Sequence, residues 1–185
     1  MVTIVAPKLT YEDLRKMPDD GKRYELIDGE VFMTPAPRPR HQRTVGRLYR
    51  ALADFVEKQG LGEVLLAPTD VVLGERTAVQ PDLLYIARDR ASIATELNVQ
   101  GAPDLVIEVL SPSNAAFDRE TKLQVYARAG VRELWYLDPA TRTAEILELG
   151  GDGRYVLAST LSGDSRITST VLPGLFLPLA DLFPG

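Results

Sequence analysis

Asp82, Glu108 and Lys122 are the residues of this sequence whose types and positions suggest chemistry. Glu108 lies inside the apolar run Asp104–Leu110, whose β-forming residues predict a buried strand. An ionised carboxylate in such a strand is costly unless a cationic partner or a metal ion compensates its charge. We therefore interpret Glu108 as a candidate metal ligand.

Two further residues qualify as partners of Glu108. Asp82 lies in a strand predicted over Val79–Ile86, and Lys122 follows Glu108 by 14 positions in the next predicted helix. Two carboxylates can hold a cation that activates water, and a lysine can orient that water and stabilise the developing oxyanion. The set predicts metal-assisted cleavage of a phosphodiester. The same residue types also suit a buried Glu108–Lys122 ion pair, or an Asp82 that caps a bulge.

The composition limits the kinds of site that this chain can build. The 185 residues include no cysteine and a single histidine, His41, which excludes thiolate sites and multi-histidine zinc sites. A metal ion would be held mainly by oxygen, which favours magnesium or manganese. The net charge of −5 argues against a protein that coats nucleic acid by bulk electrostatics.

No membrane segment and no export signal is expected. No apolar run approaches the ~20 residues that a membrane helix needs. The N-terminal stretch lacks the basic start, apolar core and cleavage site of a signal peptide. We expect a cytoplasmic protein.

The elements that must position the candidate residues mix helices and strands in a single domain over residues 1–185. The pair Asp28-Gly29 predicts a tight hairpin in which Leu26 faces Val31. The predicted helices cover Tyr11–Met17, His41–Gln59 and Phe117–Ala129. The other predicted strands cover Glu63–Ala67, Asp70–Leu73, Val79–Ile86, Asp104–Leu110, Glu133–Leu137, Thr143–Leu149 and Tyr155–Thr160, with a loop over Ala87–Gln100.

Four stretches carry a resemblance to a known family: YELIDGEVFMTPAP, VQPDLLYI, GAPDLVIEVLSPSN and DRETKLQVYARAGVRELWYLDP. In this order they resemble the bacterial Uma family of restriction endonucleases, within the PD-(D/E)XK nuclease superfamily. The resemblance implies an α/β (α+β) fold with a mixed central sheet flanked by helices, and cleavage of DNA with magnesium. It makes Asp82 and Glu108 the metal-binding acids, and the main-chain carbonyl of Val109 a further metal ligand.

One departure from the superfamily motif concerns the lysine. It should stand two residues after the second acid, where this sequence has Leu110, and the family resembled supplies it from the following helix as Lys122. The resemblance also implies a further acid from the N-terminal region, Glu25 or Glu30, of which Glu30 is preferred because it lies beside the hairpin turn. His41 is expected to contact substrate phosphate, to join the same site as the acids, or to be structural.

The leading hypothesis is therefore a magnesium-dependent DNA endonuclease, with Arg43, Arg47 and Arg50 on one helix face as contacts for the DNA backbone. That basic face also suits a simple solvated surface. Because a double-strand cut needs two active sites, we expect a homodimer. The alternatives are a catalytically silent binding module with the same fold, and a metal hydrolase of a smaller phosphodiester.

Overall fold

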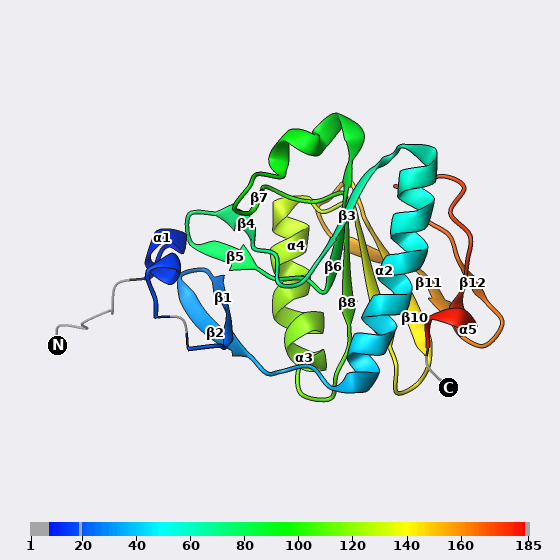
Figure 1. Ribbon diagram of the computed structural model, residues 1–185, viewed down its shortest axis with the longest axis horizontal. Coiled ribbons are helices and arrows are strands. Elements are labelled where there is room, and N and C mark those ends of the chain that lie inside the picture. Colours follow the sequence, from blue (N-terminus) through cyan, green and yellow to red (C-terminus); the bar gives the residue numbers. More distant parts are fainter. Residues whose placement is uncertain (1–7, 19, 184–185) are drawn as a thin grey trace.

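A computed structural model describes residues 8–18 and 20–183 of the chain (Figure 1). Its centre is a six-stranded mixed sheet in the order β11-β10-β9-β8-β6-β3. Helix α2 (Pro39–Gln59) covers one face of this sheet, and the helix that ends with α4 (Leu123–Ala129) covers the other (Figure 1). The sheet strands are β3 (Gly62–Leu66), β6 (Leu83–Ala87), β8 (Leu105–Val109), β9 (Glu133–Asp138), β10 (Thr143–Leu149) and β11 (Tyr155–Leu161).

Strand β8 is the predicted buried strand, and it lies in the middle of the sheet. It pairs in parallel with β9 and antiparallel with β6, and all five of its residues are buried. Because side chains alternate along a strand, Ile107 and Val109 pack in the core beneath α2. Glu108 points to the opposite face, where Val106 and Leu110 pack in the core beneath α4. Leu110, at the position of the superfamily lysine, is thus part of this second core.

Helix α2 confirms the predicted amphipathic helix. Pro39 lies in its first turn, and Gly60 ends it in the left-handed conformation at φ 62°, which glycine adopts without steric cost. The apolar stripe faces the sheet, with Val45, Leu48, Leu52 and Val56 buried and Tyr49 and Phe55 partly buried. This packing fixes the start of the helix, and hence His41, against the end of β8.

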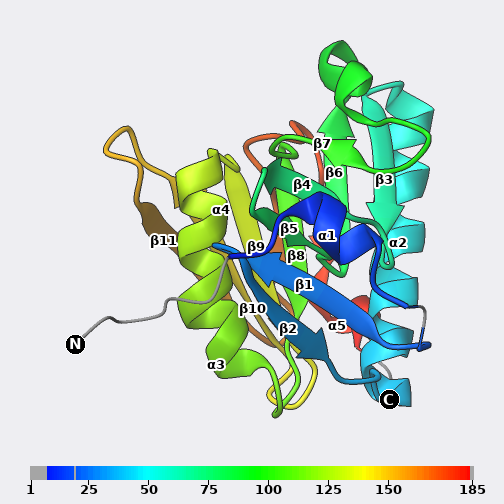
Figure 2. The ribbon, with the colours of Figure 1, turned by 90° about the vertical axis from the view of Figure 1, so that its left-hand side faces the viewer.

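A second sheet stands beside the first and contains the predicted hairpin (Figure 2). Strands β1 (Arg23–Ile27) and β2 (Glu30–Thr34) pair with Leu26 opposite Val31, as predicted. Asp28 and Gly29 form the turn with positive φ angles of 51° and 83°. The order β2-β1-β5-β4-β7 is completed by β4 (Val71–Gly74), β5 (Thr77–Val79) and β7 (Val99–Gln100).

The strand predicted over Val79–Ile86 is confirmed over Leu83–Ile86, but Val79 belongs to another strand, because the chain bends and changes sheet at Pro81, where a proline within the predicted strand indicated an edge position, a bulge or a bend. β5 ends at Val79 in the hairpin sheet, and β6 begins at Leu83 in the six-stranded sheet. Proline has no amide hydrogen for a strand ladder, so the chain leaves one sheet at Pro81 and enters the other after Asp82. This places Asp82 at the junction of the two sheets.

The helix before β9 begins two residues earlier than predicted and is irregular in its middle. α3 (Ala115–Phe117), a π-helical turn over Asp118–Lys122 and α4 form one helix, in which the Leu123 amide donates to the Asp118 carbonyl. Such wide turns are rare and occur often at functional sites. Gly130 ends the helix in the left-handed conformation, so the predicted helix end at Ala129 is confirmed.

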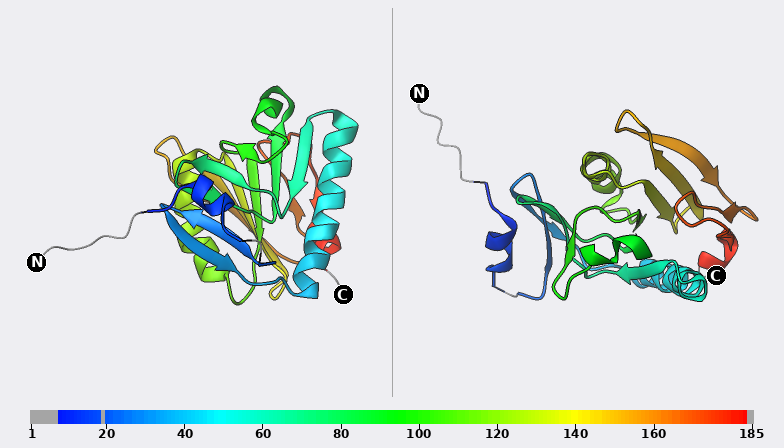
Figure 3. Two further views of the ribbon diagram at one scale, coloured as in Figure 1. Left: turned by 60° about the vertical axis from the view of Figure 1, so that its left-hand side comes forward. Right: turned by 90° about the horizontal axis from the view of Figure 1, so that it is seen from above.

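The remaining elements complete the surface (Figure 3). α1 (Tyr11–Arg15) begins with a capping box between Thr10 and Asp13, and the loop after β6 contains a 3₁₀ turn over Arg88–Ile93. At the C-terminal end, β12 (Arg166–Ile167) pairs with β13 (Leu177–Pro178), and α5 (Leu179–Leu182) lies beside α2. Within the described chain, no helix has both the length and the hydropathy that a membrane span requires.

Asp104, just before β8, is fully buried beneath two arginines. Its carboxylate accepts hydrogen bonds from Arg90, at 2.8 Å, and from Arg132, and also from the Ala87 amide at 2.8 Å. Burial acts to raise the pKa of Asp104, but these donors outweigh it and lower the pKa below its usual value. The contacts tie β8 to the end of β6 and the start of β9.

We expect Asp104→Asn to lower the free energy of unfolding by about 2–3 kcal/mol, because it removes the charge that two partly exposed arginines share. Urea unfolding monitored by circular dichroism measures this loss. Asp89→Asn, an exposed acid in the neighbouring 3₁₀ turn, is the control and should change stability by under ~0.5 kcal/mol. Equal stability of the two variants would contradict the prediction.

Candidate active site

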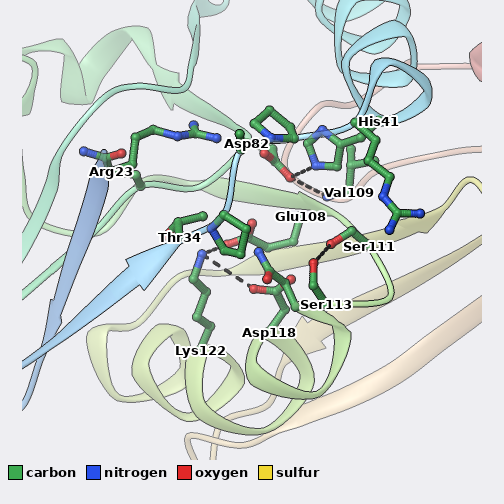
Figure 4. Close-up of a pocket in the computed structure, with 16 residues that line it drawn as sticks. Arg23, Thr34, His41, Asp82, Glu108, Val109, Ser111, Ser113, Asp118 and Lys122 are labelled. Carbon is green, nitrogen blue, oxygen red and sulfur yellow. Dashed lines mark hydrogen bonds and ion pairs between the residues drawn. The ribbon is translucent and has the colours of Figure 1, made fainter. Parts of the chain in front are cut away.

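The Lys122 ammonium lies among three carboxylates from three different elements, and two of them, Glu108 and Asp118, are shown in Figure 4. Its Nζ is 3.0 Å from Oε1 of Glu108 on β8, 2.9 Å from Oε1 of Glu25 on β1 and 3.6 Å from Oδ1 of Asp118. All four side chains are at most 6% exposed. Lys122 therefore reaches back to the strand that carries Glu108, as the sequence predicted.

Two tyrosines fix the helix that carries Lys122. Tyr126, one turn after Lys122, donates its hydroxyl to Glu108 Oε1 at 2.5 Å. Tyr136 on β9 donates its hydroxyl to the main-chain carbonyl of Asp118 at 2.7 Å, at the start of the π-helical turn. The wide turn and these two hydroxyls hold the lysine and Asp118 toward β8.

Asp82 connects the site to helix α2. Its Oδ2 accepts a hydrogen bond from the Val109 amide at 2.8 Å and lies 3.0 Å from Nε2 of His41. The Asp82 side chain is 15% exposed and that of His41 is 11% exposed. Asp82 thus connects the last residue of β8 with the first turn of α2. Its position in the sequence, far from both elements, does not reveal these contacts.

Asp82 and Glu108 line one cavity of about 280 Å³. The walls come from the end of β8, the first turn of α2, the linker before α2 and the loop after β8, and they include Arg23, Thr34, Pro35, Pro37, Arg38, His41, Gln80, Val109, Ser111, Ser113, Asn114, Asp118 and Lys122 (Figure 4). In the described part of the chain, two buried side-chain polar atoms have no hydrogen-bond partner, Nδ1 of His41 and Oε1 of Gln80. Both belong to residues of this cavity.

The burial of the acids changes their protonation. Burial raises the pKa of Glu108 well above its usual value, Lys122 opposes this rise, and the nearby Asp118, Asp82 and Glu25 add to it. Burial likewise raises the pKa of Asp118 to about 6, against the opposing effect of Lys122. Burial acts to lower the pKa of Lys122, but Glu108, Glu25 and Asp118 outweigh it and raise the pKa well above its usual value. The lysine is therefore a cation throughout the physiological range.

Of the two N-terminal acids, the structure brings Glu25 to the site and leaves Glu30 outside it. Glu25 also accepts a hydrogen bond from the Gln80 amide at 2.7 Å, whereas Glu30 is exposed beside the turn. The preference for Glu30 was wrong, because the hairpin opens toward the site at the end away from the turn. Strand alternation puts Glu25 and Glu30 on the same face of the hairpin, and the two acids differ in their burial.

The three arginines of the predicted basic face differ in their contacts in the structure. Arg47 donates to the main-chain carbonyls of Asp181, at 3.2 Å, and Phe183, at 2.7 Å, so its guanidinium holds the C-terminal helix α5. A role of Arg47 in contacting DNA is therefore not supported by its position. Arg43 and Arg50 are exposed on α2, and neither lines the cavity.

Several residues of the cavity were not predicted from the sequence. Asp118 was not among the predicted site residues. Its helical spacing from Lys122 suits a pair on the surface, but both side chains are buried at the π-helical turn. Arg23 and Arg38, which line the cavity, lie outside the arginine stripe that the helical periodicity indicated. Gln80 precedes the Pro81-Asp82 pair and was hidden in the strand predicted there.

The acids do not form a ready-made metal cage. Among the described residues, no three acidic or histidine side chains converge as a metal site, and Lys122 lies at the meeting point of Glu25, Glu108 and Asp118. Oε2 of Glu108 and Oδ1 of Asp82, however, accept no hydrogen bond within that part of the chain. These two oxygens and the Val109 carbonyl are oxygen donors of the kind that magnesium prefers, so the residues present fit a cation held by two carboxylates.

Comparison with solved structures identifies a similar fold. The chain resembles a crystal structure of a protein from Anabaena variabilis described as a putative nuclease of the DUF820 family, with a TM-score of 0.78 and 19% sequence identity over 95% of this chain and 97% of that chain. The likeness confirms the predicted restriction-endonuclease-like fold, with a mixed central sheet flanked by helices. A search of curated proteins finds no match.

The match to a family model covers nearly the same part of the chain. The model of the family Uma2, described as "Putative restriction endonuclease", matches residues 11–180. The match includes the hairpin acid Glu25, the Pro81-Asp82 junction, strand β8 and the helix with Lys122. This chain belongs to the Uma2 family.

Proposed function

We propose that this protein is a metal-dependent nuclease that hydrolyses phosphodiester bonds of DNA. The observation that carries the proposal is the unbalanced charge of the site. Three carboxylates, those of Glu25, Glu108 and Asp118, surround Lys122, and a fourth, that of Asp82, lines the same cavity beside His41, so the acids outnumber the one lysine of the site. A divalent cation restores the balance, because uncompensated buried charge is costly. The description of the Uma2 family supports the same function.

In this proposal Asp82, Glu108 and the main-chain carbonyl of Val109 hold Mg²⁺ or Mn²⁺. The bound ion supplies a Lewis acid that lowers the pKa of a water molecule and neutralises charge on the phosphate. Oδ2 of Asp82 is held by the Val109 amide and His41, which leaves Oδ1 for the ion. Oε1 of Glu108 is held by Lys122 and Tyr126, which leaves Oε2.

Lys122 is the proposed electrostatic catalyst. Its ammonium donates a hydrogen bond to the attacking water and faces the negative charge that develops on the phosphate oxygens. Glu25 and Asp118 do not touch the substrate and act as positioning residues, since both hold Nζ beside Glu108. The raised pKa keeps Lys122 charged, so in this role it orients the water and does not remove its proton.

The proposed DNA contacts are distributed around the cavity. Arg23 and Arg38 line it, and their guanidinium groups make no hydrogen bond or ion pair in the described chain, so both are available for phosphate. Arg43 and Arg50 on the exposed face of α2 offer further contacts for the backbone. Cleavage of both strands of a duplex would require a second active site, which a homodimer supplies.

Substitution of the metal-binding acids tests the function directly. Asp82→Ala and Glu108→Ala should each lower the rate of plasmid nicking with Mg²⁺ or Mn²⁺ by at least ~10³-fold, since each removes a ligand of the ion. Gel electrophoresis of nicked and supercoiled plasmid measures the rate. Glu57→Ala, an exposed acid on α2, is the control and should nick like the wild type. Nicking that survives both substitutions would eliminate the proposed site, and a wild type that nicks no DNA would favour a catalytically silent module.

A substitution of Lys122 distinguishes a role in orienting water from a role in binding the metal ion. We expect Mg²⁺ at ~100 times its dissociation constant to stabilise the wild type by about 2.7 kcal/mol, seen as a rise in melting temperature. Asp82→Asn and Glu108→Gln should abolish this rise. Lys122→Gln should keep the rise and still lose at least ~10²-fold in nicking rate. Loss of the metal-dependent rise in Lys122→Gln would instead make the lysine part of the metal-binding framework.

The pKa of Asp118 predicts a stability that depends on pH without metal. Because its pKa is raised from 3.8 to about 6 on folding, the folded state binds the proton more tightly, and this contribution is full below pH 3.8 and lost as pH rises through 6. Asp118→Asn lacks the titration, so relative to the wild type it should gain about 2.4 kcal/mol of stability between pH 4 and pH 8. Urea unfolding in EDTA across this range measures the difference. A difference between wild type and variant that stays constant with pH would refute the prediction.

A further inference from the structure

The active-site cavity continues into a second hollow along the β1–β2 hairpin. The two hollows share Arg23 and the four residues from Thr34 to Pro37. The second hollow has a volume of about 530 Å³ and extends between Lys22, Met33, Gln42 and Pro68. The two hollows are therefore adjacent and are called here together the hairpin groove, in which the inner hollow contains the proposed metal-binding acids.

The acids lie at the bottom of this groove. The Glu108 and Lys122 side chains are 3% and 5% exposed, and that of Asp82 is 15% exposed. The inner cavity of about 280 Å³ lies at the lower end of the ~300–1,000 Å³ found for sites that enclose one small molecule. A paired, stacked duplex is a stiff rod with a persistence length of ~50 nm, and it cannot place one phosphate with its sugar into such a recess without distortion. An unpaired strand can bend into it.

The chemistry of the groove also suits a single strand. Two cations that make no ion pair within the described chain, Arg23 and Arg38, stand where phosphates would pass. Beside them, Met33 is 57% exposed and Pro35 and Pro68 are exposed, which gives apolar surfaces for the faces of bases. Single-strand sites combine cations that follow the phosphates with side chains that lie against the faces of the bases, whereas duplex sites neutralise many phosphates. The net charge of −5 agrees with a short contact.

We propose that the hairpin groove binds single-stranded DNA and that the nuclease acts on unpaired strands in preference to intact duplex. Arg23 and Arg38 contact the phosphates beside the scissile bond, and Met33 and Pro68 support the neighbouring bases. This inference rests on the proposed nuclease function but not on the homodimer, because the cleavage of one unpaired strand needs one active site.

A cleavage assay with one sequence in three forms tests the substrate class. A labelled oligonucleotide is offered to the wild-type protein with Mn²⁺ as a single strand, as a full duplex and as a duplex with a central unpaired bubble. We expect cleavage of the single strand and of the bubble, and cleavage of the duplex about 10²-fold slower, since unpairing costs a few kcal/mol. Equal rates on duplex and single strand would overturn the single-strand proposal and leave the nuclease function standing.

A binding assay gives a result that does not depend on cleavage. Fluorescence anisotropy in EDTA should show wild-type protein binding the single strand at least ~10-fold more tightly than the duplex, with a salt slope near −1.4 for two neutralised phosphates. If no DNA is cut but this preference holds, the groove stands and the nuclease function fails. Equal binding of both forms would overturn the groove whatever the cleavage result.

Two matched pairs of variants locate the binding surface. Arg23→Gln should reduce the salt slope by about 0.7, while the control Arg154→Gln, an exposed arginine before β11, leaves it unchanged. Met33→Ser should weaken single-strand binding roughly fivefold, whereas Leu157→Ser removes an apolar side chain of similar exposure, 54%, on β11 and has no effect. Equal effects within either pair would place the binding surface elsewhere.

Discussion

The buried Lys122 ammonium is the interaction on which the architecture around the site depends. A cation removed from water must be matched by anions at short range, and the matching carboxylates come from β1, from β8 and from its own helix. Glu25 belongs to the hairpin sheet and Glu108 to the central sheet, so the lysine joins two sheets as well as two acids. The hairpin, which has its own small core around Leu26, is in this way fixed to the strand and the helix that carry the candidate site.

The site is not electrostatically complete by itself, and its remaining polar groups indicate where a ligand is needed. The acids outnumber the lysine, and the His41 and Gln80 side chains each retain a buried polar atom without a partner. Elsewhere in the described chain, buried charges are matched closely. Glu133, for example, accepts hydrogen bonds from Trp135 and from the main chain and hydroxyl of Thr170. Incomplete compensation at one cavity of an otherwise satisfied interior is typical of a functional site.

The sequence predicted those features that local chemistry determines. The period of α2, the hairpin turn at Asp28-Gly29 and the burial of Glu108 follow from short-range patterns, and the resemblance to a family added Lys122.

The residues that were not predicted from the sequence depend on the tertiary arrangement. Nothing local distinguishes Glu25 from Glu30, since both lie on one face of the hairpin and only the packing of the second sheet buries one of them. The change of sheet at Pro81-Asp82 was likewise hidden, because the residues on both sides are apolar β-formers. Asp118 and Lys122 suited a surface pair under regular helical geometry, and the wide turn that buries them has no sequence pattern of its own.

That wide turn has a consequence for how this protein tolerates changes in length. A π-helical turn holds one residue more than a regular α-helical turn. The helix from Ala115 to Ala129 therefore contains one residue more than a regular α-helix between the same two ends would have. Deletion of one residue within Asp118–Lys122 would restore regular winding and still join the same end points. The residues on either side of the turn would keep their directions, whereas those within it, Asp118 and Lys122 among them, would take the directions of regular winding. The position of the lysine ammonium is therefore specified by the number of residues between Ser111 and Gly130 as much as by the identity of the residue, and a single-residue gap here would change the candidate site while it preserves the fold.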